Sequence, residues 1–181
     1  MAVHGFRRTL TGRIVLRVDD VEKGLLVMLL QQLIDFVAPE GEEPEDPLAR
    51  MVGIDPDAET PDDPALARLF PDAYRDDPEA AAEFRRVTER SLRETKVAQA
   101  RTALETLQRS GEKVTLSADD AAAWLGALTD IRLALGSRLD ISEDTLDEMA
   151  DLPDEDPRAA TYHVYDWLTF LQESLVQSLM P

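Results

Sequence analysis

A recurring Asp-Pro pair divides this chain into helical segments. The pairs Asp46-Pro47, Asp63-Pro64, Asp77-Pro78 and Asp156-Pro157 each precede a run in which apolar residues recur with a helical period. An aspartate just before a helix accepts hydrogen bonds from free backbone N–H groups, and a proline at the first helical position has no N–H to leave unsatisfied. We therefore predict a helix start at each pair, and a capping box formed by Ser117 and Asp120 at a fifth start.

The longest periodic segments predict four long helices, over residues 20–38, 78–110, 117–139 and 156–180. The first contains "LLVMLLQQLIDFV", which is apolar nearly all round and is typical of a central helix. The third contains Gly126 and Gly136. Because a glycine inside a helix costs about 1 kcal/mol relative to alanine, these two indicate close packing against a neighbouring element.

The N-terminus follows a period of two. After a turn at Thr11-Gly12, Ile14, Leu16 and Val18 share one face, which predicts a hairpin that the helix over residues 20–38 can cover. The run "KVTL" at 113–116 predicts a short third strand. We therefore expect an α+β fold that is mainly α-helical. A bundle of about four long helices would carry a small antiparallel sheet, made of the N-terminal hairpin plus the short third strand.

Residues 1–181 have the length of a single domain with a sizeable core, and we expect one domain. Two acidic stretches interrupt it. Residues 39–64 form an acidic proline-rich loop with a short helix at "PLARMV", and residues 140–156 form an acidic segment with a short helix from Ser142. Both are predicted to be solvated.

Composition excludes several classes of function. The chain has 37 acidic and 19 basic residues, a formal net charge of −18 and no cysteine. The charge repels nucleic acids and anionic lipid, so we expect no direct binding to nucleic acid or membrane. Without cysteine there is no thiolate chemistry in this sequence. No apolar run is long enough to span a membrane and the start lacks a secretory pattern, so we expect a cytoplasmic protein.

No motif assigns a reaction. The two histidines, His4 and His163, show no metal-ligand spacing, and nucleophile-elbow, dinucleotide-binding and P-loop motifs are absent. A triad of residues distant in sequence stays open. We predict that the protein is not an enzyme, and we expect neither a cofactor nor a metal.

The second long helix carries a basic band. Arg85, Arg93 and Lys96 lie within about 80° of one another on the helical wheel, with Glu89 among them. The candidate interaction or ion-pair cluster comprises Arg85, Arg93, Lys96, Arg132, Asp130 and Asp166. We favour internal pairing of the band with carboxylates such as Asp72, Asp130 or Asp166. The alternative is that the band, with Arg132, binds an acidic partner segment or a small anion.

Three phrases carry a family resemblance: "RLFPDAYRDDPEAAAEFRRVTERSLRETK", "AWLGALTDIRLALGSRL" and "YHVYDWLTFLQESLV". In this order, and after an N-terminal hairpin, they resemble a small actinobacterial family of unknown-function proteins whose named branch is the AosR type, the actinomycete oxidative-stress regulators. The resemblance implies a non-enzymatic regulator that contacts an alternative sigma factor. That branch is thought to sense oxidants through a cysteine pair, which cannot apply to a sequence without cysteine.

The leading hypothesis is therefore a cytoplasmic protein–protein interaction module in stress-linked transcription control, with a protein partner such as a sigma factor. The alternative is a small-molecule or anion-binding protein, or an enzyme that no motif identifies. A homodimer formed through the C-terminal helix also stays open.

Overall fold

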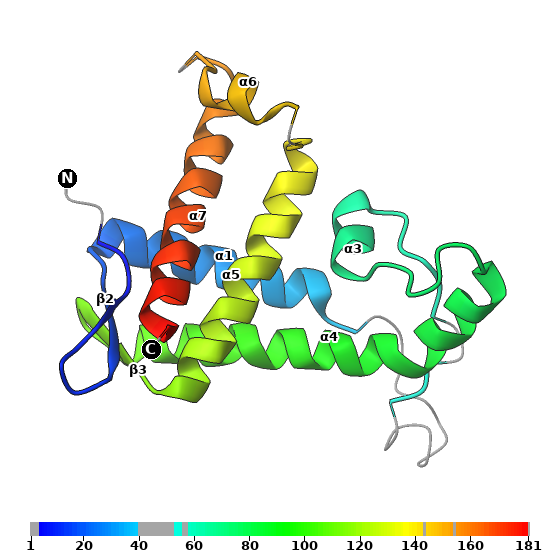
Figure 1. Cartoon of the computed structure of the whole chain (residues 1–181), viewed down its shortest axis with the longest axis horizontal. Helices are drawn as coiled ribbons and strands as arrows, with labels where there is room; N and C mark the ends of the chain where they lie inside the picture. The colour runs from blue at the N-terminus through cyan, green and yellow to red at the C-terminus, as the bar shows by residue number, and fades with distance from the viewer. Residues whose placement is uncertain (1–3, 40–52, 56–57, 143, 154, 181) are drawn as a thin grey trace.

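Two pairs of long helices form the body of the molecule. The computed structural model describes residues 4–39, 53–55, 58–142, 144–153 and 155–180. Helices α1 (Asp20–Val37) and α4 (Pro78–Gln108) lie side by side, and α5 (Ala118–Arg138) and α7 (Ala159–Leu179) form a second pair that rises across them (Figure 1). The predicted set of long helices in a mainly helical α+β fold is confirmed.

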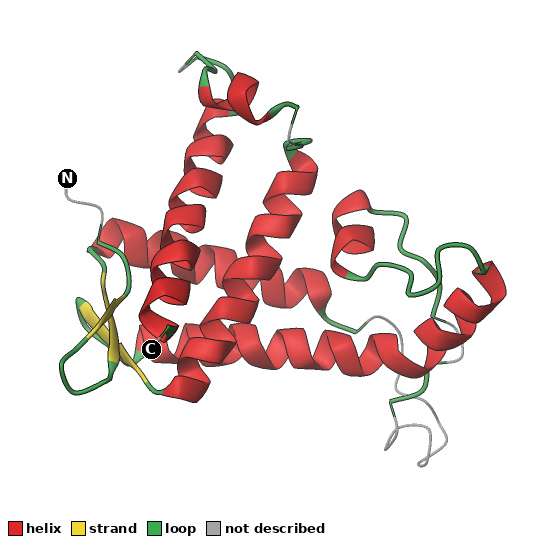
Figure 2. Cartoon of the chain, viewed as in Figure 1, coloured by secondary structure: helices red, strands yellow, loops and turns green. Residues whose placement is uncertain are grey.

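A small antiparallel sheet closes one end of the helical body (Figure 2). It consists of β1 (Arg7–Arg8), β2 (Ile14–Arg17) and β3 (Lys113–Leu116), in the order β1-β2-β3. Gly12 has a φ of 79° in the turn between β1 and β2, a conformation that glycine adopts without steric cost. The predicted hairpin and third strand are therefore confirmed.

The apolar face of the sheet is buried, as the period of two requires. Ile14 faces Leu116 and Leu16 faces Val114 across the β2–β3 pair, and all four side chains are buried. The helical neighbours of the sheet are α7, beside β1 and β2, and α4 and α5, beside β3. Helix α1, which the sequence offered as a possible cover for the hairpin, packs chiefly along α4.

Several of the predicted helix starts are correct. Asp63 accepts hydrogen bonds from two backbone N–H groups at the start of α3 (Pro64–Leu69), and Asp77 accepts one at the start of α4. Ser117 and Asp120 form the predicted capping box. Asp46-Pro47, and the short helix predicted after it, lie outside the described residues.

Two predicted starts in the acidic segment 140–156 are wrong. Helix α7 begins at Ala159 rather than after Asp156, because the Asp156 carboxylate accepts from the backbone N–H of Arg158 (2.8 Å) and pairs with its guanidinium (2.9 Å), closing a local turn. Helix α6 (Leu146–Ala150) begins after Thr145 rather than at Ser142. There the Ser142 N–H donates to the Thr145 hydroxyl (2.9 Å), so these residues form a turn instead.

Trp124 lies at the centre of the core. Its side chain is fully buried, its ring meets Phe6 edge-on at 5.6 Å between centroids, and its indole N–H donates to Thr106 Oγ1 (2.7 Å). The Thr106 hydroxyl donates in turn to the carbonyl of Ala103 (2.7 Å). The one polar atom of the tryptophan is thereby satisfied inside α4.

Replacing Thr106 by valine tests this link. The Thr106→Val variant keeps the side-chain shape but leaves the buried indole N–H without an acceptor, so we expect the free energy of unfolding to fall by about 1–3 kcal/mol. Thr95 makes a similar hydrogen bond to the Ser91 carbonyl at an exposed position, so Thr95→Val should change stability by less than about 0.5 kcal/mol. Urea unfolding measures both, and equal losses would contradict the assigned role of the Thr106 hydroxyl.

Candidate functional site

The N-terminal half of α4 turns its charged face inward. Arg85, Glu89 and Arg93 are only 6–7% exposed, whereas Phe84 and Val87 on the neighbouring face are 40% exposed or more. This arrangement is the reverse of an ordinary amphipathic helix, in which the charged side faces water. Because buried charges require partners, the fold around this face must supply them.

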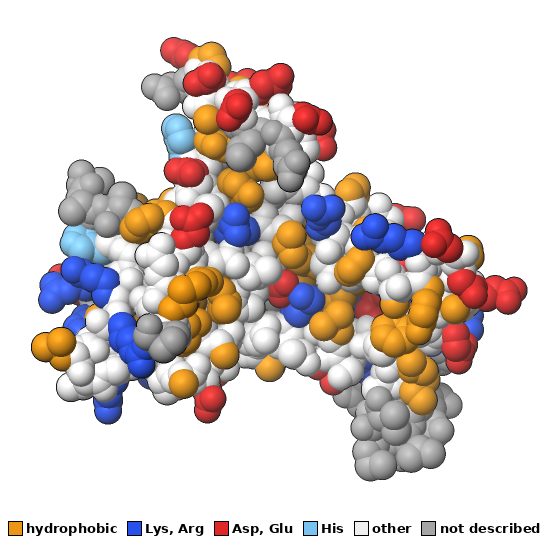
Figure 3. Space-filling view, viewed as in Figure 1, with side chains coloured by type: hydrophobic (Ala, Val, Ile, Leu, Met, Phe, Trp, Pro, Cys, Tyr) orange, Lys and Arg blue, Asp and Glu red, His pale blue; other side chains and the backbone are white. Residues whose placement is uncertain are grey.

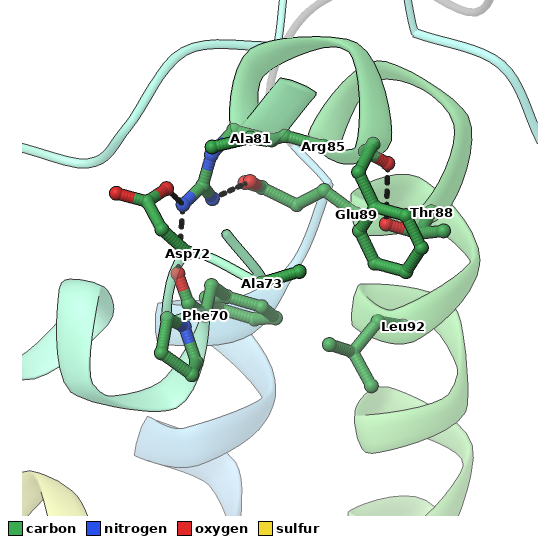
Figure 4. Close-up of a pocket in the computed structure, with 10 residues that line it drawn as sticks. Phe70, Asp72, Ala73, Ala81, Arg85, Thr88, Glu89 and Leu92 are labelled. Carbon is green, nitrogen blue, oxygen red and sulfur yellow. Dashed lines mark hydrogen bonds and ion pairs between the residues drawn. The ribbon is translucent and has the colours of Figure 1, made fainter. Parts of the chain in front are cut away.

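Glu89 is the acidic centre of this face. Its Oε1 accepts a hydrogen bond from Arg93 Nε (2.9 Å). Its Oε2 accepts one from Arg85 Nη1 (Figure 4). Both partners lie one helical turn away, before and after Glu89, where side chains of one helix meet. One carboxylate therefore serves two buried guanidinium groups.

The two arginines reach beyond their own helix to the C-terminal ends of two others. Arg93 Nη1 donates to the carbonyl of Ala38 (3.2 Å), just after α1, and Arg85 Nη2 donates to the carbonyl of Phe70 (2.9 Å), just after α3. The last carbonyls of a helix lack partners within it and carry partial negative charge, so a cation satisfies both needs. Arg85 also pairs with Asp72 (2.8 Å).

These contacts keep Arg85 charged inside the protein. Burial alone lowers the pKa of its guanidinium, but the hydrogen bonds to Asp72 and Glu89 outweigh burial and the pKa is raised above its ordinary value. The arginine is therefore a permanent cation of the cluster.

Phe70 connects this cluster to α5. The guanidinium carbon of Arg93 lies 4.4 Å from the centroid of the Phe70 ring, and Lys96 Nζ lies 5.8 Å from it, both within cation–π range. Lys96 Nζ then donates to Asp130 Oδ1 on α5 (2.6 Å). Burial raises the pKa of Asp130 above its ordinary value, although the Lys96 ammonium partly offsets this effect.

The remaining predicted site residues lie elsewhere. Arg132 is held between α5 and α7 by hydrogen bonds to Thr169 Oγ1 (3.0 Å) and to the Gln172 side-chain oxygen, and its guanidinium lies over the Tyr165 ring. Asp166 is exposed on α7 and takes part in none of the ion pairs among the described residues. The structure therefore brings together Arg85, Arg93, Lys96 and Asp130, but neither Arg132 nor Asp166.

Two members of the cluster were not chosen as candidate site residues from the sequence. Glu89 stood within the basic band, but helical spacing alone did not mark it as the shared partner of two arginines. Phe70 contributes its ring and its backbone carbonyl. No sequence pattern predicts which backbone carbonyl will accept a hydrogen bond from a distant side chain.

The cluster has no space for a cofactor. The cavity beside it, lined by Phe70, Asp72, Arg85, Glu89 and neighbouring residues, has a volume of about 60 Å³ (Figure 4). Sites for small molecules usually have volumes of about 300–1,000 Å³. Across the described part of the chain, no three His, Cys, Asp or Glu side chains gather in a way that could hold a metal ion. The observed contacts of the cluster join α4 to the ends of α1 and α3 and to α5.

Comparison with known proteins places the chain in a family. A model of the family described as "Domain of unknown function (DUF2017)" matches residues 3–179. The chain belongs to this family. It is 38% identical over 155 residues to the oxidative stress regulator AosR of Mycobacterium tuberculosis strain H37Rv, covering 78% of this chain and 70% of that protein.

A second relative extends the match. The putative oxidative stress regulator AosR of Mycobacterium leprae is 36% identical over 174 residues, covering 88% of this chain and 79% of that protein. No solved structure matches the chain. The resemblance to an actinobacterial family of AosR type is therefore confirmed. In the described residues of this member, no helix is both long and apolar enough to cross a membrane.

Removing the charge of Glu89 tests the cluster. The Glu89→Gln variant keeps the shape but leaves two buried arginines without their carboxylate, so we expect the free energy of unfolding to fall by about 3–5 kcal/mol. The matched control is Glu83→Gln on the same helix, where an exposed carboxylate pairs with Arg86 (3.2 Å) and its loss should cost at most about 1 kcal/mol. Equal losses in the two variants, measured by chemical unfolding, would contradict the proposed role of Glu89.

Removing the charge of Asp130 should not lower the free energy of unfolding, in contrast to the loss expected for Glu89→Gln. A carboxyl whose pKa is raised by folding makes the folded state bind more protons than the unfolded state between about pH 4 and the raised value, so stability falls as pH rises through this window. The amide oxygen of asparagine can still accept the hydrogen bond of the single, partly exposed ammonium of Lys96, so we expect Asp130→Asn to be at least as stable as the unmodified protein at neutral pH.

The two stabilities should then converge as pH falls towards 4, because a protonated carboxyl and an amide are alike in charge. Urea unfolding at several pH values measures the difference, with Asp166→Asn, the same substitution at an exposed position, as the matched control. A clear loss of stability in Asp130→Asn at neutral pH would contradict the interpretation that burial raises the pKa of Asp130.

Proposed function

We propose that this protein is a non-enzymatic regulator that acts in the cytoplasm by binding a protein of the transcription machinery under stress. Two observations support the proposal. The relatives at 36–38% identity carry the name oxidative stress regulator. The second observation is an exposed acidic surface around α6, which lies outside the ion-pair cluster.

The interaction surface of this proposal is the acidic end of the molecule around α6. The exposed acids among the described residues there are Asp140, Asp144, Asp147, Glu148, Asp151 and Glu155. Within the described residues, the ion pair between Asp156 and Arg158 is the one that involves this segment. Red side chains gather over α6 in the space-filling view (Figure 3).

The basic band of α4 does not form the partner-binding surface, because its cations already pair with carboxylates of this protein. Arg85 and Arg93 are paired with Glu89 and buried, and the Lys96 side chain is 14% exposed and paired with Asp130. A partner attracted to this protein would therefore meet negative charge at the α6 end. The complementary surface is basic, and binding through it weakens as salt screens the charges.

The partner class in this proposal is an alternative sigma factor, or an associated polymerase element, with a basic surface. No thiol switch within this sequence can control the contact, because it contains no cysteine. A sequence without cysteine is consistent with an adaptor, that is, a protein whose bound fraction depends on the concentration of its partner.

The test uses the full-length protein and purified sigma factors from the same organism. Binding is measured at low and at high ionic strength for two variants that each remove three negative charges. One is Asp147→Asn, Glu148→Gln and Asp151→Asn at the α6 end. The control is Glu105→Gln, Glu112→Gln and Glu173→Gln, three exposed acids in other parts of the chain.

We expect the unmodified protein to bind at low salt and to bind more weakly at high salt. The first variant should lose at least about tenfold in affinity, and the control variant should keep most of it. Unfolding temperatures of both variants should match the unmodified protein. Absence of binding at low salt, or equal losses in the two variants, would contradict the proposal.

Self-association is a second candidate, because Phe170, Leu179 and Met180 at or near the C-terminal part of α7 are 40% exposed or more. Light scattering of the same samples would detect a homodimer.

A further inference from the structure

A second cleft, away from the ion-pair cluster, lies where α3, α5 and α7 converge. It has a volume of about 630 Å³, in the usual range for small-molecule sites. Its lining includes Arg68 from α3, Arg132 and Ser137 from α5, Asp140 and Ser142 from the loop after α5, and Tyr165 from α7. Blue side chains are visible over this part of the surface, in contrast to the red end around α6 (Figure 3).

Arg132 is the fixed element of this cleft. Its Nε donates to Thr169 Oγ1 (3.0 Å), one terminal nitrogen donates to the Gln172 side-chain oxygen, and its guanidinium carbon lies 5.3 Å from the centroid of the Tyr165 ring. Gln172 is itself fixed, since its amide nitrogen donates to Thr129 Oγ1 (2.7 Å). The guanidinium is therefore oriented before any ligand arrives, which lowers the entropy lost on binding.

The charge of Arg132 is oriented but not neutralised. Its partners are a hydroxyl, an amide oxygen and an aromatic ring, and no carboxylate pairs with it among the described residues. Arg68, an exposed lining residue from α3, also takes part in none of the ion pairs of that part of the chain. Both arginines line one cleft without an ion-pair partner among the described residues, in a protein of net charge −18.

We propose that this cleft binds a small organic anion that carries a carboxylate or phosphate group. Arg132 holds the anionic group through the N–H groups that Thr169 and Gln172 leave free, and Arg68 of α3 adds a second positive charge. The hydroxyls of Ser137 and Ser142 are available for polar atoms of the ligand, and the Tyr165 ring supplies an apolar surface. The cleft shares Asp140 with the edge of the acidic α6 surface, but it includes none of the three acids that are substituted in the test of that surface.

Asp140 provides the sharpest test, because it places a negative charge on the same cleft. Its φ of 54° lies in the left-handed region, which asparagine adopts readily. Asp140→Asn therefore removes a charge that repels the ligand without straining the backbone, and binding should strengthen severalfold. A substitution that merely disturbed the structure would weaken binding, so a gain of affinity in Asp140→Asn would specifically support an anion in this cleft.

The probes are citrate, ribose 5-phosphate and inorganic phosphate at millimolar concentration, with sodium chloride of matched ionic strength as the reference. Thermal unfolding and calorimetric titration of the full-length protein measure binding, since a ligand of the folded state raises its stability with concentration. Citrate and ribose 5-phosphate distinguish carboxylate from phosphate chemistry. We expect at least one of them to stabilise the protein beyond sodium chloride.

The variants then locate the site. Arg132→Gln and Arg68→Gln should each weaken binding by about ten- to a hundredfold, and Arg101→Gln, an exposed arginine on α4 outside the cleft, should not. Arg132 also links two helices, so Arg68→Gln, at an exposed position, keeps the test valid if Arg132→Gln folds poorly. Stabilisation by no probe beyond sodium chloride, or equal stabilisation of all variants, would overturn the proposal.

Discussion

The shared carboxylate of Glu89 is the interaction on which much of the surrounding structure depends. It neutralises Arg85 and Arg93, and these reach the ends of α3 and α1 respectively. Three helices that are separate in sequence are thereby joined at one buried point. A purely apolar contact would fill the space, but it would not satisfy the terminal carbonyls.

Charge is distributed unevenly over the molecule. Arg85, Arg93 and Lys96 of α4 pair with carboxylates inside the protein, and the acidic segment at the α6 end has one ion pair among the described residues, Asp156 with Arg158. In the cleft between α3, α5 and α7, Arg68 and Arg132 have no carboxylate partner among the described residues. The protein therefore offers two electrostatically opposite features, a broad acidic surface suited to a macromolecule and a narrow basic cleft suited to a small ligand. A regulator without cysteine could use both, one for its partner and one for its signal.

Local signals in the sequence predicted much of the fold correctly. The Asp63 and Asp77 caps, the capping box at Ser117 and the alternation of Ile14, Leu16 and Val18 depend on neighbours within a few residues, and the structure follows them. Asp156 is the instructive exception. An adjacent arginine offers its carboxylate a charged partner within two residues, and this contact replaces the helix cap.

The sequence by itself determined that Arg85, Glu89, Arg93 and Lys96 share a helix face, because helical geometry fixes the angle between side chains. Only the tertiary structure decided that this face points inward, that backbone carbonyls of Ala38 and Phe70 complete it, and that Arg132 belongs to a different cleft. The physical reason is that a helical wheel contains no information on which side meets another element. That choice is made by the packing of α1, α3 and α5 around α4, through contacts between residues far apart in the chain.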